Sequence, residues 1–484
     1  MLNKTRKLLV RIAAVGFVLL VVVLALRVWD MQNGPPLGPW HTFVPEELDR
    51  DAVDRADWAR WIAAEDSLFA SVRREVSGRL EPEEQVATNR YFSGSPVDPD
   101  RFARNWNRSF VLEPDGPPRG AAVFLHGLTD APFSLRHFAE TYRARGFVAI
   151  GIRMPGHGAA PSGLTQAVWE DWMAATRLAV REARRRAGTG LPLHIVGYSN
   201  GGALALKHAL DALEDERLPQ ADRLVLISPM VGVTAFARFA GIAGLPALLP
   251  RFAKTAWLDI QPEFNPFKFN SFPVNAARQT YRLTAALHEQ LDRLATVGTL
   301  RRLPPVLTFQ SVVDATVSTP AVLSRLYARL PANGSEIVLF DLNRNTRFGP
   351  LFGAGADAAL ERILPPAPRD FAVTVIANIS PATTEATVRR TPAGATATEE
   401  TPLGLAWPRD VFSLSHVALP FPPQDGLYGN EPDPADDFGV RLGALAVRGE
   451  RGVLAVGLDS LSRVTWNPFF PYVLDRVTGG LPPP

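Results

Sequence analysis

Short apolar runs recur along the chain from residue 109 onward, separated by stretches with helical spacing. Each run is nearly continuous in aliphatic and aromatic residues, the pattern of a strand that is buried on both faces. Such strands alternate with helices when right-handed crossovers build a parallel sheet. The sequence therefore predicts an α/β fold, with a mostly parallel central sheet flanked by helices. The predicted strands are 121–125, 147–152, 193–197, 224–227, 306–309 and 337–340.

Two stretches interrupt this alternation. Residues 230–300 are long, aromatic and punctuated by proline, which predicts a helical cap or lid inserted into the core. Residues 341–410 form a second insertion. We therefore expect the core to comprise residues 108–229 and 301–484, with the cap between them and the 341–410 insertion inside the second part.

The second insertion has little hydrophobic pattern of its own. A helix is expected near residues 356–364 and a strand near residues 371–376. The Thr/Ala-rich stretch 382–402 is typical of a flexible surface excursion, because it offers few large apolar residues to bury.

The N-terminus carries the longest apolar run of the chain, residues 12–26, preceded by lysine and arginine. Counted back to Leu8 past Arg11, the run has nineteen residues, close to the length of a helix that crosses the roughly 30 Å hydrocarbon layer of a membrane. A cleaved signal peptide and an uncleaved anchor both fit it, and the bulky residues 26–29 after a weak cut site favour the anchor. We expect residues 1–33 to be a single-pass membrane anchor and spacer. The catalytic domain is then expected on the non-cytoplasmic side, periplasmic or extracellular.

Residues 34–107 connect the anchor to the core. Between about residues 46 and 80, apolar residues recur at spacings of three and four, which predicts an amphipathic helical segment. Its other face mixes acidic and basic residues, so we expect the stripe to pack on the core rather than on a membrane.

The composition removes several classes of function. A net charge of +2 gives no reason to expect a nucleic-acid partner. The chain has no cysteine, which excludes disulfides, thiolate metal sites and a cysteine nucleophile. Its eight histidines are scattered without the spacing of metal ligands. We therefore predict neither a metal nor a cofactor, and the oligomeric state stays open.

The clearest motif is G-x-S-x-G at residues 197–201, between an apolar strand and a helical stretch. A serine that projects from a sharp strand-to-helix turn has a strained backbone, and side chains two residues away would collide. Glycine at 197 and 201 avoids that collision. The context predicts that Ser199 is a nucleophile, with an ordinary glycine-rich turn as the alternative.

A serine nucleophile needs two amide donors for the oxyanion that forms during acyl transfer. In this arrangement one donor follows the nucleophile, which gives Asn200, and the other lies in a loop after an earlier strand. Residues 124–129 end such a strand, and we choose the amide of Leu128. His126 in that loop is expected to shape it rather than to act in catalysis.

The general base and the acid should follow the nucleophile in the order Ser, Asp or Glu, His. His416 alone among the histidines lies in a loop far enough along the chain. Asp314, just after the strand at 306–309, is the expected acid, and Asp341 is the alternative. The other histidines precede Ser199 or lie in helical stretches: His41, His126, His137, His157, His194, His208 and His288.

Several motifs together resemble the α/β-hydrolase superfamily, and most of all its monoacylglycerol lipase and lysophospholipase-like branch. The resemblance covers roughly residues 108–340 and 410–475, and it implies a Ser199–Asp314–His416 triad. It also implies an oxyanion hole from the amides of Leu128 and Asn200, with a cap over the site. The motifs are H-G-L at 126–128, R-M-P-G-H-G at 153–158, G-Y-S-N-G-G at 197–202, D-A-T-V at 314–317 and S-H-V around His416.

These residues predict a serine hydrolase that cleaves carboxylic esters through an acyl-enzyme. The anchor and the apolar cap favour a lipid-derived ester, similar to a monoacylglycerol or a lysophospholipid, over a small soluble one. Two alternatives stay open: an amidase or aminopeptidase on the same scaffold, and a non-catalytic binding module of the cell envelope.

Overall fold

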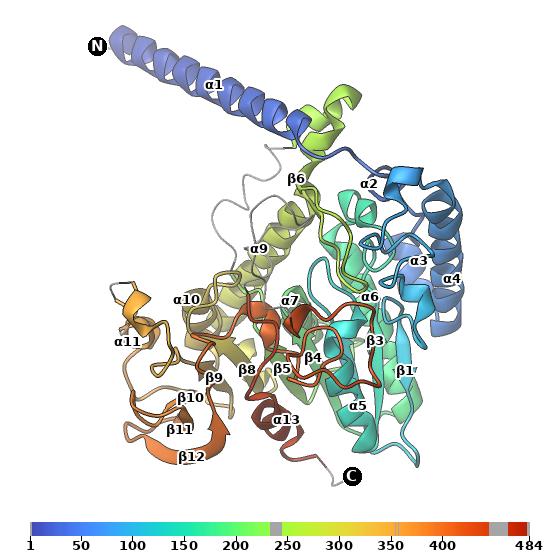
Figure 1. Ribbon diagram of the computed structural model, residues 1–484. Coiled ribbons are helices and arrows are strands. Elements are labelled where there is room, and N and C mark those ends of the chain that lie inside the picture. The colour runs from blue at the N-terminus through green and yellow to red at the C-terminus, as the bar shows by residue number, and fades with distance from the viewer. Residues whose placement is uncertain (1, 233–243, 354, 357, 445–462, 482–484) are drawn as a thin grey trace.

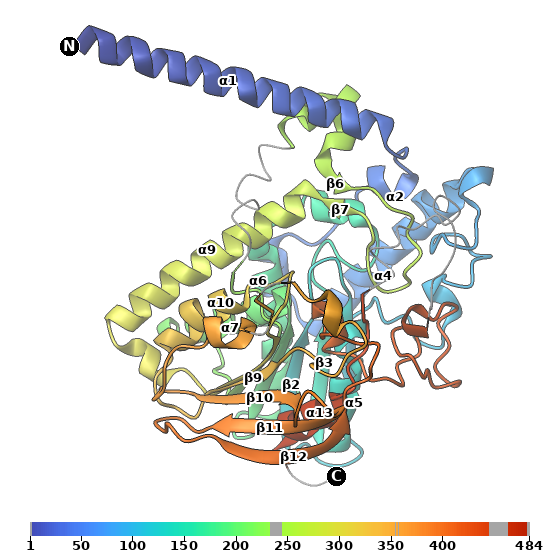
Figure 2. The same ribbon diagram turned by 60° about the vertical axis from the view of Figure 1, so that its left-hand side comes forward.

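A ten-stranded sheet runs through the body of the protein, with helices on both faces (Figures 1 and 2). The computed structural model describes residues 2–232, 244–353, 355–356, 358–444 and 463–481. The strand order is β1-β3-β2-β4-β5-β8-β9-β10-β11-β12. All pairs from β3 to β10 are parallel, whereas β1 at one edge and β11 and β12 at the other are antiparallel. The predicted fold class, a mostly parallel α/β sheet, is confirmed.

The central strands lie where the apolar runs predict them, because nearly every residue in them is buried. The strands are β1 Phe110–Leu112, β2 Gly120–Leu125, β3 Phe147–Ile152, β4 Leu193–Tyr198, β5 Arg223–Ile227, β8 Val306–Ser311, β9 Glu336–Phe340, β10 Ala372–Asn378, β11 Glu385–Thr391 and β12 Glu399–Ala406.

Successive strand residues point into two separate cores, as the two-residue period of a strand requires. Val123 belongs to the core on one face of the sheet, and its neighbour Phe124 belongs to the core on the other. The first core is covered by α6 Trp169–Ala187, α7 Asn200–Glu214 and α9 Val274–Thr296. The second is covered by α5 Arg136–Ala144 and α13 Phe470–Thr478.

The second insertion extends the sheet instead of leaving it. The predicted strand near 371–376 is confirmed as β10, which pairs in parallel with β9. The helix expected near 356–364 is present but shorter, α11 Ala359–Ile363. The prediction of a flexible excursion at 382–402 is wrong, because β11 and β12 form an antiparallel pair there. Val388, Leu403 and Leu405 pack against the second core, and Arg389 pairs with Glu400 across the two strands, 3.2 Å apart.

The N-terminus is one continuous helix, α1 Leu2–Asn33, that projects from the body (Figure 1). Among the described residues, one helical stretch, Val10–Asn33, is long and apolar enough to cross a membrane. Three further helices follow: α2 Pro39–Thr42, α3 Arg50–Arg55 and α4 Trp58–Glu75.

The predicted helical stripe between residues 46 and 80 is divided between α3 and α4 and packs on the core. Asp57 starts α4 by accepting a 2.8 Å hydrogen bond from the amide of Arg60. The buried Arg153 guanidinium bonds Glu47 at 2.7 Å and Glu65 at 3.0 Å. This ion cluster fastens the N-terminal helices to the end of β3.

Between β5 and β8 the chain forms η7 Leu245–Leu248, η8 Pro250–Ala256, a small hairpin of β6 Trp257–Asp259 and β7 Phe272–Pro273, and then α9. Phe267 stacks on Phe133, ring centroids 4.2 Å apart, so this part of the expected cap packs on the core. Residues 233–243 of the predicted cap lie outside the described residues.

Candidate active site

Ser199 occupies the sharp turn between β4 and α7. Its backbone has φ 54° and ψ −118°, a conformation that non-glycine residues rarely adopt. The turn is held by hydrogen bonds from the Ser199 amide to the carbonyl of Ile227 and from the Met230 amide to the carbonyl of Ser199, both 2.9 Å. The strain predicted for a nucleophile turn is therefore present.

The two flanking glycines are required by close backbone contacts. A Cβ atom on Gly201 would lie 1.9 Å from the carbonyl oxygen of Leu125. A Cβ atom on Gly197 would lie 2.4 Å from the carbonyl oxygen of Gly201. No other residue fits either position without moving the backbone, which is the physical basis of the G-x-S-x-G pattern.

Asp314 and His416 meet although 102 positions separate them in the sequence. The Nδ1 atom of His416 lies 3.1 Å from Oδ2 of Asp314, in the geometry of a donor to a carboxylate. The amides of Thr316 and Val317 donate to the other oxygen, Oδ1, at 2.8 and 2.9 Å. Burial alone would raise the pKa of Asp314, but the hydrogen bond and charge of His416, with the other donors, hold this pKa below its ordinary value.

The imidazole of His416 lies beside the nucleophile turn. Its ring packs against the ring of Tyr198, centroids 5.2 Å apart, and Tyr198 immediately precedes Ser199. The Tyr198 hydroxyl also donates to the carbonyl of His416 at 3.4 Å. Within the described part of the chain, no hydrogen bond joins the Ser199 hydroxyl to His416. Such bonds are often long in empty enzymes and shorten when substrate binds.

The predicted oxyanion loop lies against the nucleophile. A Cβ atom on Gly127 would come within 3.2 Å of the Cβ of Ser199. Asn200 is the first residue of α7, so its amide has no acceptor within the helix. Among the described residues, the backbone amides of Leu128 and Asn200 donate to no protein group. Both are therefore available as hydrogen-bond donors, as the predicted oxyanion hole requires.

His126 shapes this loop, as expected. Its Nδ1 lies 2.8 Å from the Gly127 carbonyl, and its Nε2 accepts from the amide of Met154 at 3.0 Å. Burial lowers the pKa of His126 to about 4, so the ring is neutral and can accept that bond.

Two polar residues that the sequence reasoning missed also hold Asp314. Ser228 follows β5 with φ 46° and donates its hydroxyl to Asp314 Oδ2. Gln310, near the end of β8, donates its Nε2 to the same oxygen at 3.1 Å. Gln310 lies on β8, the strand that leads to Asp314, and Ser228 follows β5, the strand next to it. Their position at the carboxyl ends of these strands was the signal that the sequence offered.

The remaining candidates have other partners. Asp341, the alternative acid, lies 3.5 Å from Arg344. The other histidines are placed by structural contacts: His41 with Ser271, His137 with Asp425, His194 with Tyr142, His208 with the Pro219 carbonyl, and His288 with the Val231 carbonyl. His157 contacts the Pro155 carbonyl. Within the described residues no group of three or more carboxylate or imidazole side chains could hold a metal ion.

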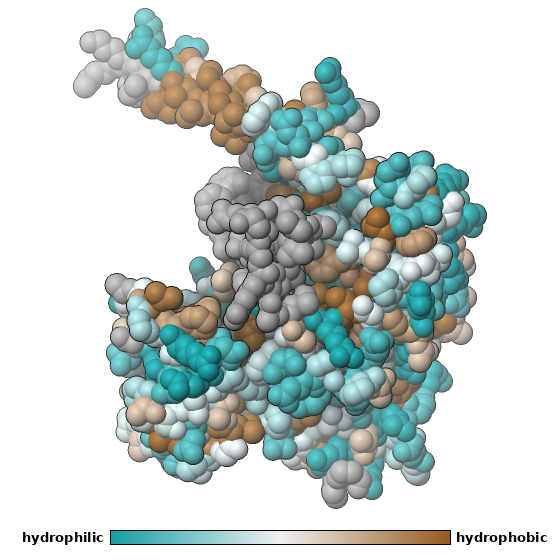
Figure 3. Space-filling view, viewed as in Figure 1, coloured by the Kyte–Doolittle hydropathy of each residue, from teal (hydrophilic) through white to brown (hydrophobic). Residues whose placement is uncertain are grey.

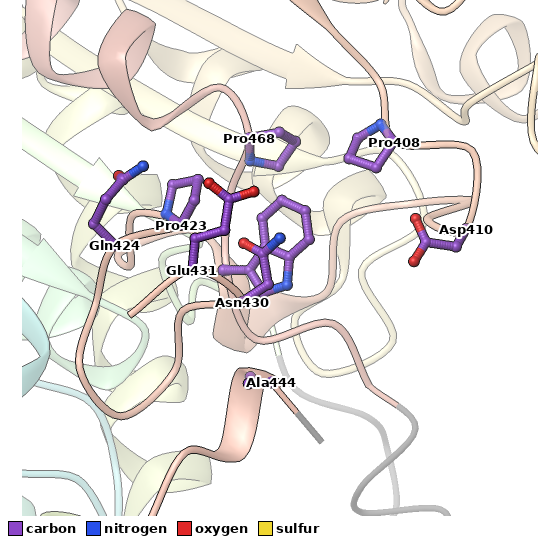
Figure 4. Close-up of a pocket in the computed structure, with 10 residues that line it drawn as sticks. Pro408, Asp410, Pro423, Gln424, Asn430, Glu431, Ala444 and Pro468 are labelled. Atoms are coloured by element: carbon purple, nitrogen blue, oxygen red, sulfur yellow. The ribbon is translucent and has the colours of Figure 1, made fainter. Parts of the chain in front are cut away.

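Two cavities flank the segments on either side of His416. One, of about 600 Å³, has His416, Leu414 and Arg463 in its wall. The other, of about 590 Å³, is shown in Figure 4, and its lining includes Glu431, Asn430, Pro423, Pro468 and Trp466. Ser199 is in the wall of neither of these two cavities.

Comparisons with known proteins place residues 116–342 in a family described as "Serine aminopeptidase, S33". A thermostable monoacylglycerol lipase from Bacillus sp. (strain H-257) is 27% identical over 217 residues, which are 45% of this chain and 78% of the relative. Solved structures that are similar include a monoacylglycerol lipase of Paleococcus ferrophilus, with 18% identity and a TM-score of 0.36 over 53% of this chain and 97% of that one. A monoglyceride lipase of Saccharomyces cerevisiae has 15% identity and a TM-score of 0.37, over 48% and 81%.

The family match begins just before β2 and ends just after β9, so it contains Ser199, Asp314 and the predicted oxyanion loop but not His416. The sheet order and the strained turn after β4 agree with that match. Residues 116–342, just under half of the chain, match that family, and the chain has an α/β-hydrolase fold; it is a hydrolase of the esterase and lipase type that resembles monoacylglycerol lipases.

Proposed function

We propose that this chain hydrolyses lipid-derived carboxylic esters, similar to monoacylglycerols or lysophospholipids, with Ser199, His416 and Asp314 as catalytic residues. The observation that carries the proposal is the bond of 3.1 Å between His416 Nδ1 and Asp314 Oδ2, beside the strained Ser199 turn. That bond fixes the proton on Nδ1 and leaves Nε2 as the basic nitrogen. The relative from Bacillus, named a monoacylglycerol lipase, supports the substrate class.

The mechanism follows from this arrangement. Ser199 Oγ attacks the ester carbonyl carbon while His416 Nε2 takes the hydroxyl proton. The amides of Leu128 and Asn200 donate to the oxyanion, and Asp314 stabilises the imidazolium. When the tetrahedral intermediate collapses, His416 gives its proton to the leaving alcohol. Water then attacks the acyl-enzyme by the same route and releases the carboxylic acid.

We also propose that α1 anchors the chain in a membrane. Arg6, Lys7 and Arg11 precede the apolar stretch, and positive charge is retained on the cytoplasmic side. The body of the chain then lies on the other side, periplasmic or extracellular. Residues 230–300 would form the cap over the site, as the domain division from sequence has it.

An aminopeptidase or amidase is the second candidate, because the matching family carries that description. Recognition of a substrate amine needs an ionised carboxylate that is not already paired. Asp130 follows the predicted oxyanion loop and stays ionised at pH 7, because burial raises its pKa only to about 6, but the nearby charge of Lys268 already compensates it. This environment favours the ester over the amine-bearing substrate.

A fluorophosphonate probe tests the nucleophile directly, since it reacts only with an activated serine. Ser199→Ala is expected to abolish labelling and to lower ester hydrolysis by about 10⁶-fold. Ser67→Ala, on the exposed face of α4, is the control and should label normally. Undiminished labelling of Ser199→Ala would move the nucleophile elsewhere.

The substrate class is tested separately, with p-nitrophenyl esters of increasing chain length and a matched p-nitroanilide. The proposal expects kcat/KM to rise with acyl length and the ester to be cleaved faster than the anilide. A steep preference for acetate would contradict the lipid substrate, and faster anilide cleavage would favour the amidase.

A further inference from the structure

The C-terminal turns of α1 are bonded to the segment between β5 and β8. The Arg27 guanidinium donates to the carbonyl of Trp257 at 2.7 Å and to that of Thr255 at 3.3 Å. Gln32 donates to the carbonyl of Arg251 at 2.9 Å, and Lys254 donates in return to the carbonyl of Gly34 at 2.9 Å. These bonds run in both directions, so they fix the angle between α1 and η8.

An apolar cluster fills the same joint. Met31 from α1 packs with Trp257 and Ile260, and Leu37 completes the cluster. Trp257 is almost fully buried, and its ring meets the edge of His41 at 4.7 Å between centroids. The joint therefore has a packed interior as well as polar contacts, which is what a fixed connection requires.

The segment that contacts α1 continues directly to the proposed oxyanion loop. Ser271, which accompanies β7, bonds His41 Nε2 at 2.9 Å. Two residues earlier, the amide of Phe269 donates to the carbonyl of Thr129 at 2.7 Å, next to Leu128. One continuous segment therefore contacts α1 near its start and the proposed oxyanion loop near its end.

The position of the joint relative to a bilayer follows from helix geometry. A hydrocarbon layer of roughly 30 Å takes about 20 residues at 1.5 Å each, so a span centred on the apolar run ends near Arg27. The six residues that follow to Asn33 extend about 9 Å further, which is within the headgroup layer. Figures 1 and 3 show α1 standing clear of the body, with η8 at its C-terminal end.

The surface at this joint has the composition of a membrane interface. Leu249 and Leu258 are 59% and 37% exposed, and Trp29 on α1 is 69% exposed. Arg251 and Lys254 lie between the two leucines in the sequence. Exposed leucine and tryptophan together with basic residues are typical of segments that lie in the headgroup region.

We propose that residues 249–258 dock on the bilayer that holds α1. Leu249 and Leu258 enter the boundary between headgroups and acyl chains, and the exposed Arg251 faces anionic headgroups. The ester substrate then enters the site from the leaflet that residues 249–258 contact. This inference rests on the proposed membrane anchor and goes beyond it, because an anchor alone would leave the body free to turn away from the membrane.

The absence of cysteine from the natural chain makes a depth measurement direct, because each introduced cysteine is unique. The full chain is reconstituted in vesicles of phosphatidylcholine with about one-fifth phosphatidylglycerol, and a nitroxide is attached to L249C or L258C. Relative accessibility to oxygen and to a nickel chelate reports the depth of each label. Val18→Cys, in the middle of α1, is the lipid control, and Leu351→Cys, 81% exposed on the body, is the water control.

The labels at 249 and 258 are expected to read as the boundary region, between the two controls. If they read as water while the label at 18 reads as lipid, the docking is wrong and the anchor stands. If the label at 18 also reads as water, the anchor and the docking both fail. Neither reading depends on whether the chain hydrolyses esters.

A kinetic test uses Leu249→Asp and Leu258→Asp combined. This variant is expected to lose about tenfold or more in kcat/KM toward a monoacylglycerol embedded in those vesicles and to keep its rate on soluble p-nitrophenyl butyrate. Equal loss on both esters, or no loss on either, would overturn the docking. If the natural chain cleaves neither ester, the proposed function fails, whereas the depth measurement still decides the docking.

Discussion

The proposed nucleophile and the proposed acid–base pair are held in place in different ways. Ser199 belongs to one continuous strand–turn–helix unit, and its position is fixed by backbone contacts as close as the one between Gly201 and Leu125. His416 and Asp314 come from segments 102 residues apart and are joined by one hydrogen bond. The chain after His416 is in turn fastened to α5 by the buried ion pair of Arg136 and Asp425, 2.6 Å apart.

The difference predicts how each part fails. A backbone packed against backbone cannot adapt, so a single added methyl group should remove the turn altogether. A side chain held by several polar contacts can lose one of them and remain near its place, so its losses should be graded. The following changes test this contrast in order of expected effect.

Gly201→Ala should have the largest effect. Its Cβ would lie 1.9 Å from the Leu125 carbonyl oxygen, so β2 or α7 must move and Ser199 leaves its position. We expect activity to fall on the order of 10⁵-fold and the free energy of unfolding to fall by about 3 kcal/mol. Ester hydrolysis and urea unfolding of the full chain in detergent measure both. Gly190→Ala, which meets no atom within 4 Å, is the control. Near-natural activity of Gly201→Ala would show that the turn tolerates displacement.

Asp314→Asn should come next, with a loss of about 10⁴-fold in kcat, because the amide favours the wrong imidazole tautomer and cannot stabilise the imidazolium. Asp341→Asn is the matched control, since this alternative acid contacts Arg344 instead of His416. Steady-state rates on a soluble ester distinguish the two. The assignment is wrong if Asp341→Asn loses the greater part of kcat.

The same contrast explains what could be predicted from the sequence. The turn was predictable because its determinants are local: an apolar strand, two glycines around Ser199, and a helical pattern after them. Asp314 and His416 followed from the order of residues in such sites and from elimination among eight histidines, and the structure brings the two side chains together. Their catalytic roles stay predictions.

What the sequence did not predict depends on partners distant in the chain. Ser228 after a strand looks like any small polar residue until the position of Asp314 is known. The pairing of Arg136 with Asp425 joins residues 289 apart, and no local pattern marks it. The strands β11 and β12 were missed because their outer residues are polar and their stability comes from addition to the edge of an existing sheet.

Asp425→Asn tests the fastening of the His416 segment. Burial alone would raise the pKa of Asp425, but Arg136 and His137 hold it well below its usual range. A depressed carboxylate pKa contributes stability above the unfolded value of about 3.9, and this contribution is lost as the pH falls below it. We therefore expect the variant to lose about 3 kcal/mol at pH 7 and the difference from the natural chain to shrink as the pH falls below about 4.

Urea unfolding of the variant and of the natural chain, at pH 7 and again below about pH 4, measures this difference in stability. Arg143 lies on the same helix as Arg136, α5, and forms an exposed ion pair with Asp115, which precedes β2. Arg143→Met is therefore the control and should change the stability little at either pH. A loss for Asp425→Asn that is the same at both pH values would mean that its charge does not stabilise the fold.

Ser228→Ala should have the smallest effect and is the most informative about graded loss. The hydroxyl is one of several donors to Asp314, so the carboxylate should keep its bond to His416 and kcat should fall only about tenfold, since a hydrogen bond to a charged group contributes about 1.5–3 kcal/mol. Because that donor lowers the pKa of Asp314, its removal raises this pKa, and the more basic carboxylate favours a protonated His416, which should move the acidic limb of the rate profile to higher pH. Ser311→Ala is the matched control, because this buried hydroxyl near the end of β8 has no partner among the described residues. A pH profile that shifts equally in both variants would reduce Ser228 to a packing residue, whereas a shift confined to Ser228→Ala would show that the carboxylate is tuned by contacts that each contribute a part.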